Sequence, residues 1–293
     1  MVEPSRGRYV LITPARDEAD NIARLIESVL TQSIPPSAWV IVDDGSVDGT
    51  AEIARLAAAG ERCVTVVSLE SRRPADFASK ARAFAAGVET IGDRPHDFIG
   101  NLDADLSLNP DYFETVLEQF ATRPRLGIGG GKIVEVVDAK HRPQRSSATS
   151  VAGAVQMFRR ACFEEVCPYL ALPLGGEDAA AEILARMHGW EVATFSELRV
   201  VHHGRMLNRK RSASGAFFAR GKVNHSLGYD PLFHVLASGV RMGQPPYVVG
   251  GMLMVTGYAW AAVTGRQRSL PDAAVAFLRG EQRTRMRRFV RRS

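Results

Sequence analysis

The first half of the chain alternates short apolar runs with segments in which apolar residues recur every three or four positions. The short runs are typical of buried strands, and the other segments are typical of amphipathic helices. The runs are residues 9–13, 39–43, 64–68 and 98–102. Because strands that alternate with helices pair in parallel through helical crossovers, we expect an α/β fold with a mostly parallel central sheet and helices on both faces.

Several helix boundaries can also be read from the sequence. Helices are expected over residues 22–30, from Asp48, over 77–91 and from Asn109-Pro110. Asp48 is expected to cap the second of these helices, with Ile53 and Leu56 on its inward side.

Beyond residue 126 the pattern changes and predicts a different architecture. The expected elements are strands at 126–137 and 150–158 with a polar loop, 138–147, between them, a helix over 178–188 that stops at Gly189, and strands near 191–195 and 198–202. After Arg205 the chain is expected to be helical, with breaks at Pro231 and Pro245-Pro246. We therefore expect a Rossmann-like domain over residues 1–205 and a helical extension over residues 206–293.

Composition sets a few further limits. With 45% apolar and 24% charged residues, the 293-residue chain is an ordinary globular protein that can bury a substantial core. The net charge is +5, but the sequence has no recognised nucleic-acid-binding motif and no group of aromatic residues on which bases could stack. Nucleic acid is therefore not an expected partner. Cys63, Cys162 and Cys167 form neither a disulfide framework nor a zinc pattern, and Cys63 is expected in the core. Because the first eight residues lack the apolar region of a signal peptide, a cytoplasmic location is expected.

An uncharged segment lies near the C-terminal end. Residues 247–263 number 17, which is the short limit for a helix that spans a membrane. Tyr258, Trp260 and the seven arginines of residues 279–293 suit a helix in the membrane interface. A buried core helix is the alternative. Peripheral contact with the inner face of a membrane and a homo-oligomeric state are both compatible with the sequence.

Asp103-Ala104-Asp105 directly follows the fourth apolar run. Two carboxylates at the end of a buried strand can hold one divalent cation, and strand ends are where open α/β sheets bind ligands. Oxygen ligands suit Mg²⁺ or Mn²⁺ bridging a diphosphate, which predicts an enzyme acting on a nucleotide-linked substrate. The alternative is helix capping and loop solvation, since Asn109-Pro110 follows closely.

Other polar residues have chemical and structural interpretations. Asp44, in an Asp-Gly turn, can accept a hydrogen bond from the imide N–H of a base, and Lys80 can offset diphosphate charge or be solvated surface. Glu177-Asp178 can supply a general base or can complement a helix N-terminus. His202 and His203 end a strand, so their rings point to opposite faces and one of them can reach a cation.

Two glycine-containing segments are expected near a ligand. Residues 127–132 lack the Ser or Thr that a P-loop needs after its lysine, so we expect a glycine-rich strand close to the ligand. Gly153 is expected in a strand beside a binding pocket, where small residues leave room.

Together these segments resemble the family 2 glycosyltransferases, which have the A-type glycosyltransferase fold. The resemblance rests on residues 10–18, 40–50, 103–105, 175–178 and 200–203 in that order, and it covers about two-thirds of the chain. Arg16-Asp17-Glu18 stands where the family more often has an aromatic residue followed by Asn-Glu. Stacking of the base on an aromatic ring is therefore lost, and the guanidinium of Arg16 could stack instead.

The resemblance implies a role for each matching residue. Asp178 is implied as the general base, with Glu177 as an alternative base or acceptor contact beside Gly153. Asp105 and His202 are implied as metal ligands, while Asp103 binds ribose or supports the ion through water. The residues implied in donor binding are Pro14, Ala15, Arg16, Glu18, Asp44, Lys80, Asp103, Ala104 and Asp105.

The resemblance implies metal-dependent inverting transfer of a sugar from a nucleotide diphosphate sugar, with UDP favoured, to a hydroxyl group. The acceptor would be a saccharide or a lipid-linked saccharide in cell-surface glycan synthesis. Three alternatives remain: a retaining transferase on the same fold, a sugar nucleotidyltransferase, and a binding protein that has kept the pocket. The first loop, from Pro14 to Glu18, lacks the glycine-rich basic sequence that a nucleotidyltransferase favours.

Overall fold

The computed structural model describes residues 7–70, 78–137, 140–143, 149–166, 170–203, 213–244 and 246–290. The chain divides into two compact units, one formed by residues 1–171 and 177–205 and the other by residues 172–176 and 206–293. They are called the sheet unit and the helical unit below. The functional division expected between residues 205 and 206 stays a prediction.

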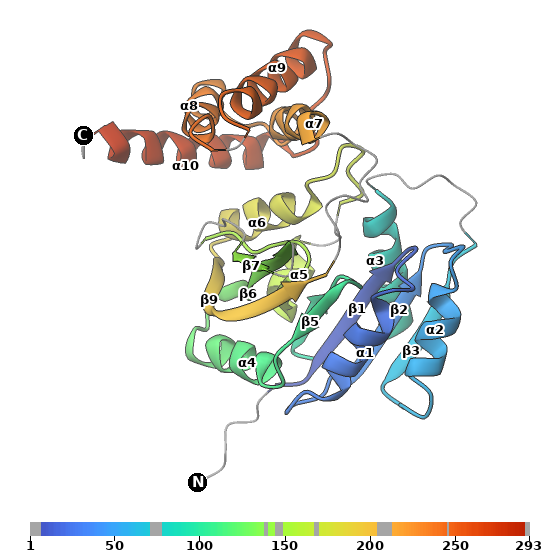
Figure 1. Ribbon diagram of the computed structural model, residues 1–293. Helices are drawn as coiled ribbons and strands as arrows, with labels where there is room; N and C mark the ends of the chain where they lie inside the picture. The colour runs from blue at the N-terminus through green and yellow to red at the C-terminus, as the bar shows by residue number, and fades with distance from the viewer. Residues whose placement is uncertain are drawn as a thin grey trace. The chain divides into compact units, whose positions relative to one another are not determined.

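One sheet forms the centre of the sheet unit (Figure 1). Its strand order is β3-β2-β1-β4-β8-β6-β9-β5, and β7 pairs with β6. The strands are β1 (Tyr9–Ala15), β2 (Ala38–Asp43), β3 (Val64–Ser68), β4 (Phe98–Asn101), β5 (Leu106–Leu108), β6 (Leu126–Val137), β7 (Lys140–Pro143), β8 (Met157–Arg159) and β9 (Glu191–His202). Strands β1 to β4 pair in parallel, as do β6 and β9, whereas β5, β7 and β8 pair antiparallel. The expected mostly parallel α/β sheet is confirmed.

Helices cover both faces of this sheet because alternate strand residues point to opposite sides. The helices are α1 (Ile22–Leu30), α2 (Thr50–Ala57), α3 (Ser79–Ile91), α4 (Tyr112–Thr122), α5 (Arg160–Val166) and α6 (Glu177–Met187). Tyr9 and Leu11 of β1 pack in one apolar cluster with α1, α2 and α4. Val10 and Ile12 pack in the second cluster, with α3, α5 and α6. The two clusters are the core of this unit.

The expected positions of the first four strands and of β6 hold. β1, β2, β3, β4 and β6 lie where the apolar runs predicted them. Helix α6 ends as expected just before Gly189, whose φ of +84° is readily adopted by glycine. The predicted cap of α2 was wrong: the N-cap residue is Gly49, and Asp48, one residue earlier, accepts a hydrogen bond through Oδ1 from the backbone N–H of Thr50 at 3.0 Å.

Other boundaries were wrong. Within residues 150–158 only Met157 and Phe158 belong to a strand, because the preceding residues form a loop. The two strands expected at 191–195 and 198–202 are one strand, β9. Strand β7 lies inside the segment expected as a loop, and neither β5 nor α5 was predicted.

The inward face of α2 was predicted only in part. Ile53 packs against the apolar cluster as expected, whereas Leu56 is 77% exposed. The buried residues are Thr50, Ala51 and Ala54, whose small side chains let the helix lie close to the sheet. Cys63, expected in the core, is partly exposed at the start of β3.

The helical unit contains α7 (Ala213–Ser226), α8 (Pro231–Arg241), α9 (Val249–Val263) and α10 (Asp272–Val290). Pro231 starts α8 as predicted, and Asp230 caps this helix by accepting hydrogen bonds from the N–H groups of Leu232 and Phe233. Pro245 lies outside the described residues, and a further break between α9 and α10 was not predicted. Among the described residues, none of the helices combines the length and apolar character needed to cross a bilayer.

Gly87 tests the packing of α3 on β1. A Cβ atom at this position would overlap the Cγ2 atom of Ile12. The close packing of the helix on the strand therefore requires a residue without a side chain. We expect Gly87→Ala to lower the free energy of unfolding by about 1–3 kcal/mol, although alanine favours a helix, because overpacking outweighs propensity. Urea unfolding followed by circular dichroism measures this.

Gly280 provides the matched control, since a Cβ atom added at this position in α10 would meet nothing within 4 Å. Gly280→Ala should leave stability unchanged or raise it by up to about 1 kcal/mol. Equal effects of the two substitutions would contradict the packing argument.

Candidate active site

The ends of neighbouring parallel strands bring the predicted site residues to one edge of the sheet. Ala15 of β1 lies beside Asp43 of β2, and Ile12 of β1 lies beside Asn101 of β4. The loops that leave these strands therefore start side by side. This edge is the one at which open α/β sheets bind nucleotides.

Arg16 and Asp44 join the first two loops. The backbone N–H of Asp44 donates to the carbonyl oxygen of Ala15 at 2.9 Å, and Arg16 Nη1 contacts Asp44 Oδ2 at 3.3 Å. Asp17, at a φ of +55°, accepts a hydrogen bond through Oδ1 from the N–H of Val47 at 2.9 Å. The Asp44 carboxylate is thus held in place, and the guanidinium of Arg16 lies against it.

Glu18 faces the acidic residues of the next loop. Its N–H donates to Thr50 Oγ1 at 2.8 Å, and its carboxylate accepts from the Asn21 amide at 2.9 Å. Burial, together with the nearby carboxylates of Asp105 and Asp103, raises the pKa of Glu18 to about 7. Glu18 therefore belongs to the same electrostatic site as the Asp-Ala-Asp segment.

Lys80 links Asp103 to the loop formed by residues 150–156. Its ammonium group lies 2.6 Å from Asp103 Oδ1 and donates to the carbonyl oxygen of Gly153 at 3.1 Å. The side-chain amide of Asn101 donates to the same carbonyl oxygen. Burial alone would lower the pKa of Lys80, but the Asp103 carboxylate outweighs it, so the pKa is raised and the group stays positively charged.

Asp105 and His202 are in contact because β5 pairs with the end of β9. Leu106 lies opposite His202 in this antiparallel pair, and His202 Nε2 is 3.1 Å from Asp105 Oδ2. His203 instead contacts the Ser107 hydroxyl through Nε2 at 2.7 Å. The hydrogen bond to Asp105 raises the pKa of His202. The two rings have different partners, as strand alternation predicts.

Ala104 separates the two carboxylates of the segment. It is buried in the apolar cluster that contains β1 and α4, whereas Asp103 and Asp105 are partly exposed. Within the described residues, no group of three or more His, Cys, Asp or Glu side chains is arranged to hold a metal ion. Asp105 and His202 therefore offer one oxygen and one nitrogen donor, with Glu18 electrostatically close.

The start of α6 lies against the loop of residues 150–156. A Cβ atom at Gly153 would lie 2.8 Å from Asp178 Oδ2, so a glycine is needed here to leave room for this carboxylate. Asp178 Oδ1 accepts a hydrogen bond from the N–H of Ala179 at 2.8 Å. Burial raises the pKa of Glu177, which also couples to Asp178 and Lys80.

Gly153 was expected in a strand, and that expectation was wrong. It lies in the loop before β8, and its carbonyl oxygen accepts the hydrogen bond from Lys80. The glycines of residues 127–132 lie in β6 and allow close packing: side chains at Gly130 and Gly131 would overlap the carbonyl oxygens of Val155 and Leu198.

Glu182 is a site residue that the sequence analysis missed. This buried carboxylate, 4% exposed, accepts hydrogen bonds from the N–H of Val151 at 2.6 Å and from the Gln156 amide at 3.3 Å. It lies one helical turn after Asp178 and ties α6 to the loop that carries Gly153. The sequence did contain a signal for it. Glu182 follows the expected base by four residues and lies on the side of α6 that carries Ala181 and Ala185, which indicates a buried carboxylate.

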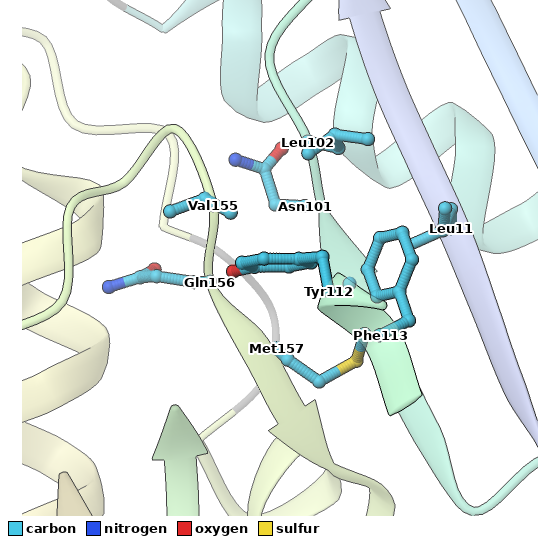
Figure 2. A pocket seen from close by; sticks show the side chains of 9 residues that line it. Leu11, Asn101, Leu102, Tyr112, Phe113, Val155, Gln156 and Met157 are labelled. Carbon is cyan, nitrogen blue, oxygen red and sulfur yellow. The ribbon is translucent and has the colours of Figure 1, made fainter. Parts of the chain in front are cut away.

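Asn101 also borders a small cavity in the core (Figure 2). Most of the lining is apolar and includes Leu11, Tyr112 and Met157. The cavity measures about 10 Å³, far below the several hundred Å³ of a typical ligand pocket. It is a gap in the packing behind the site and not a substrate pocket.

The fold and the acidic edge of the sheet define the A-type glycosyltransferase fold, and the solved structures agree. The mannosyltransferase PcManGT from Pyrobaculum calidifontis, in complex with GDP-Man and Mn²⁺, superposes with a TM-score of 0.58 at 19% identity, over 97% of this chain and 83% of that one. S. aureus TarS 1–349 in complex with UDP-GlcNAc gives 0.54 at 14% identity, over 73% and 64%. GalNAc-T7 with UDP, GalNAc and Mn²⁺ gives 0.55 at 14% identity, over 70% and 45%.

The sequence comparisons identify the family. The family model for glycosyl transferase family 2 matches residues 10–167, and the chain belongs to this family of glycosyltransferases. The 4,4'-diaponeurosporenoate glycosyltransferases of Staphylococcus aureus strains USA300 and NCTC 8325 / PS 47 are each 30% identical over 119 residues. The match covers 40% of this chain and only 29% of each relative's length.

The pH dependence of stability tests the environment of Glu182. Burial raises the pKa of Glu182 to about 7 from 4.5, so the folded state binds an extra proton between these pH values. Stability should therefore fall as pH rises through this window and level off above it. Glu182→Gln keeps a hydrogen-bond acceptor but cannot titrate. As the pH rises from 5 to 8, the free energy of unfolding of the variant should therefore increase by up to about 3 kcal/mol relative to that of the wild type.

Urea unfolding of both proteins across this pH range measures the difference. Glu89→Gln, which changes an exposed glutamate of α3, is the control and should leave the pH profile of the wild type unchanged. Parallel profiles for wild type and Glu182→Gln would contradict the assignment.

Proposed function

We propose that this chain is a metal-dependent inverting glycosyltransferase that moves a sugar from a nucleotide diphosphate sugar, with UDP favoured, to a hydroxyl group. The observation that carries the proposal is the cluster in which Lys80 lies between Asp103 and the Gly153 loop, with Asp178 against the same loop. Asp105 and His202 lie in the neighbouring loop and strand. The ammonium group of Lys80, the carboxylate of Asp178 and the contact between Asp105 and His202 support the proposed roles of charge partner, base and metal ligands.

The donor would lie across the ends of β1, β2 and β4. Asp44 accepts the base N–H, and the Arg16 guanidinium beside it, within the Pro14 to Glu18 loop, covers the base. Ala15 and Ala104, whose side chains are buried in the apolar cluster, would contact the nucleotide through their backbone. Support comes from PcManGT and TarS, whose structures contain GDP-Man and UDP-GlcNAc.

The donor atoms of Asp105 and His202 fit a divalent cation. A carboxylate oxygen and an imidazole nitrogen in contact suit Mn²⁺, and Mg²⁺ accepts the same site through its carboxylate. When bound, the cation would stabilise the negative charge that builds on the departing diphosphate. PcManGT and GalNAc-T7 were both solved with Mn²⁺.

Asp178 acts as the general base in this proposal. Its carboxylate takes the proton of the acceptor hydroxyl while the hydroxyl oxygen attacks the anomeric carbon. The bond from this carbon to the diphosphate oxygen breaks on the opposite side, which inverts the configuration. Lys80 offsets charge on the leaving group, and Glu177 lies next to the base, where it can contact the acceptor.

The acceptor is proposed to be a saccharide or a lipid-linked saccharide, used in cell-surface glycan synthesis at the inner face of a membrane. The support is the apolar helix α9 followed by an arginine-rich α10. The enzyme would contact the membrane peripherally and act from the cytoplasmic side.

Replacement of the base should stop transfer without loss of the donor. We expect Asp178→Asn to lower kcat by about a thousandfold or more while the Kd for the donor changes little, because the amide cannot accept the proton. Transfer assays and donor titration measure the two quantities. Glu177→Gln should be far milder; a wild-type rate for Asp178→Asn would refute the base assignment.

The neighbouring histidines provide a matched test of the metal site. His202→Gln should weaken Mn²⁺ binding at least about tenfold, because it removes the imidazole nitrogen that contacts the Asp105 carboxylate. His203→Gln should leave the affinity near that of the wild type. Thermal shifts with Mn²⁺ and a panel of UDP-, GDP- and dTDP-sugars report binding independently of catalysis. Equal effects of both substitutions would contradict the ligand assignment.

A further inference from the structure

Helix α8 buries its polar face and exposes its apolar face. His234 and Ser238 are buried, and His234 stacks on the Tyr258 ring of α9 with the ring centroids 4.5 Å apart. Leu232, Leu236 and Val240 lie on the opposite side at a spacing of four residues and are 60%, 51% and 70% exposed. A helix at the surface of a water-soluble bundle has the reverse arrangement.

Helix α9 shows the same inversion. Its buried residues are small: Gly250, Gly251, Gly257 and Ala261. Side chains at Gly251 and Gly257 would overlap the backbone carbonyl oxygens of Ser238 in α8 and Phe218 in α7, so the helix backbones lie in direct contact. The large apolar residues that are exposed include Val249, Met252, Trp260 and Val263. Small residues between helices and large apolar residues outside are the pattern of helices packed in lipid.

The length of α9 limits how deeply such a surface could enter lipid. Its 15 residues span roughly 22 Å, which is shorter than the roughly 30 Å hydrocarbon core of a bilayer. Tyr247 precedes the helix and Trp260 lies in its last turn, and both rings are well exposed. Aromatic residues of this kind favour the headgroup level of a membrane. The helix therefore suits a position along the interface.

Charge selects an anionic membrane over a second copy of this chain. Between residues 213 and 290 the sequence has ten Lys and Arg residues and three Asp and Glu residues. Arg266 and Arg268 follow α9 directly and are exposed, and Arg241 ends α8. Two such units would repel each other face to face, whereas anionic headgroups would attract both.

We propose that the exposed apolar faces of α8 and α9 insert into the headgroup region of an anionic bilayer. We call Leu232, Leu236, Val240, Met252 and Trp260 the lipid-facing surface. This assignment specifies the membrane contact proposed above and adds α8 to it. It does not depend on the catalytic roles of Asp105 or Asp178.

Vesicle flotation tests the lipid-facing surface. Wild-type protein should float with vesicles of phosphatidylcholine and phosphatidylglycerol, should bind pure phosphatidylcholine more weakly, and should lose binding as salt is raised. The double variant Leu232→Gln/Leu236→Gln should bind anionic vesicles at least about tenfold more weakly, because the favourable transfer of two leucine side chains from water into the bilayer is lost. Leu56→Gln, which changes an exposed leucine in α2, is the matched control and should bind like the wild type.

Three outcomes would overturn the proposal. They are failure of the wild type to float with anionic vesicles, equal binding by the double variant, and a dimer that the double variant dissociates while vesicle binding is unchanged. Circular dichroism of the variant shows that the helices still form. Donor-induced thermal shifts should match the wild type, so that a failed lipid surface is distinguished from a failed donor site.

Discussion

The charged contact between Lys80 and Asp103 is the interaction on which the rest of the site depends. It joins helix α3 to the loop after β4, and the same ammonium group holds the carbonyl oxygen of Gly153. Because Gly153 lies against Asp178, this one ammonium group links the Asp103 loop to the start of α6 through the Gly153 loop. Like charges at Asp103, Glu177 and Asp178 would repel one another without it. Glu182 completes the arrangement by fixing the loop to α6 from within the core.

Much of this architecture follows from local sequence. The strands β1, β2 and β4 are buried on both faces, so they appear as uninterrupted apolar runs that need no knowledge of distant residues. The carboxylates after them are then placed by the parallel pairing alone. Asp44 and Asp103 were predicted at the same edge for this reason, and the structure brings them there.

The parts that could not be predicted depend on long-range contacts. Val151 and Val155 suggest a strand, but the hydrogen bond to Glu182 and the close approach of β6 at Gly130 hold a loop. Strand β5 has three residues and exists because β9 pairs with it, which is what brings Asp105 to His202. The exposure of the apolar face of α8 could not be predicted either, because an apolar stripe along a helix normally indicates a buried face.

The anomeric configuration of the product tests the central claim most directly. In-line attack by a hydroxyl that Asp178 deprotonates, with departure of the diphosphate on the opposite side, must invert the configuration of the transferred sugar. NMR of the glycoside formed from an α-linked nucleotide sugar should therefore show a β-linkage in the first product. An α-linked product would mean retention, and the proposed role of Asp178 would then be wrong.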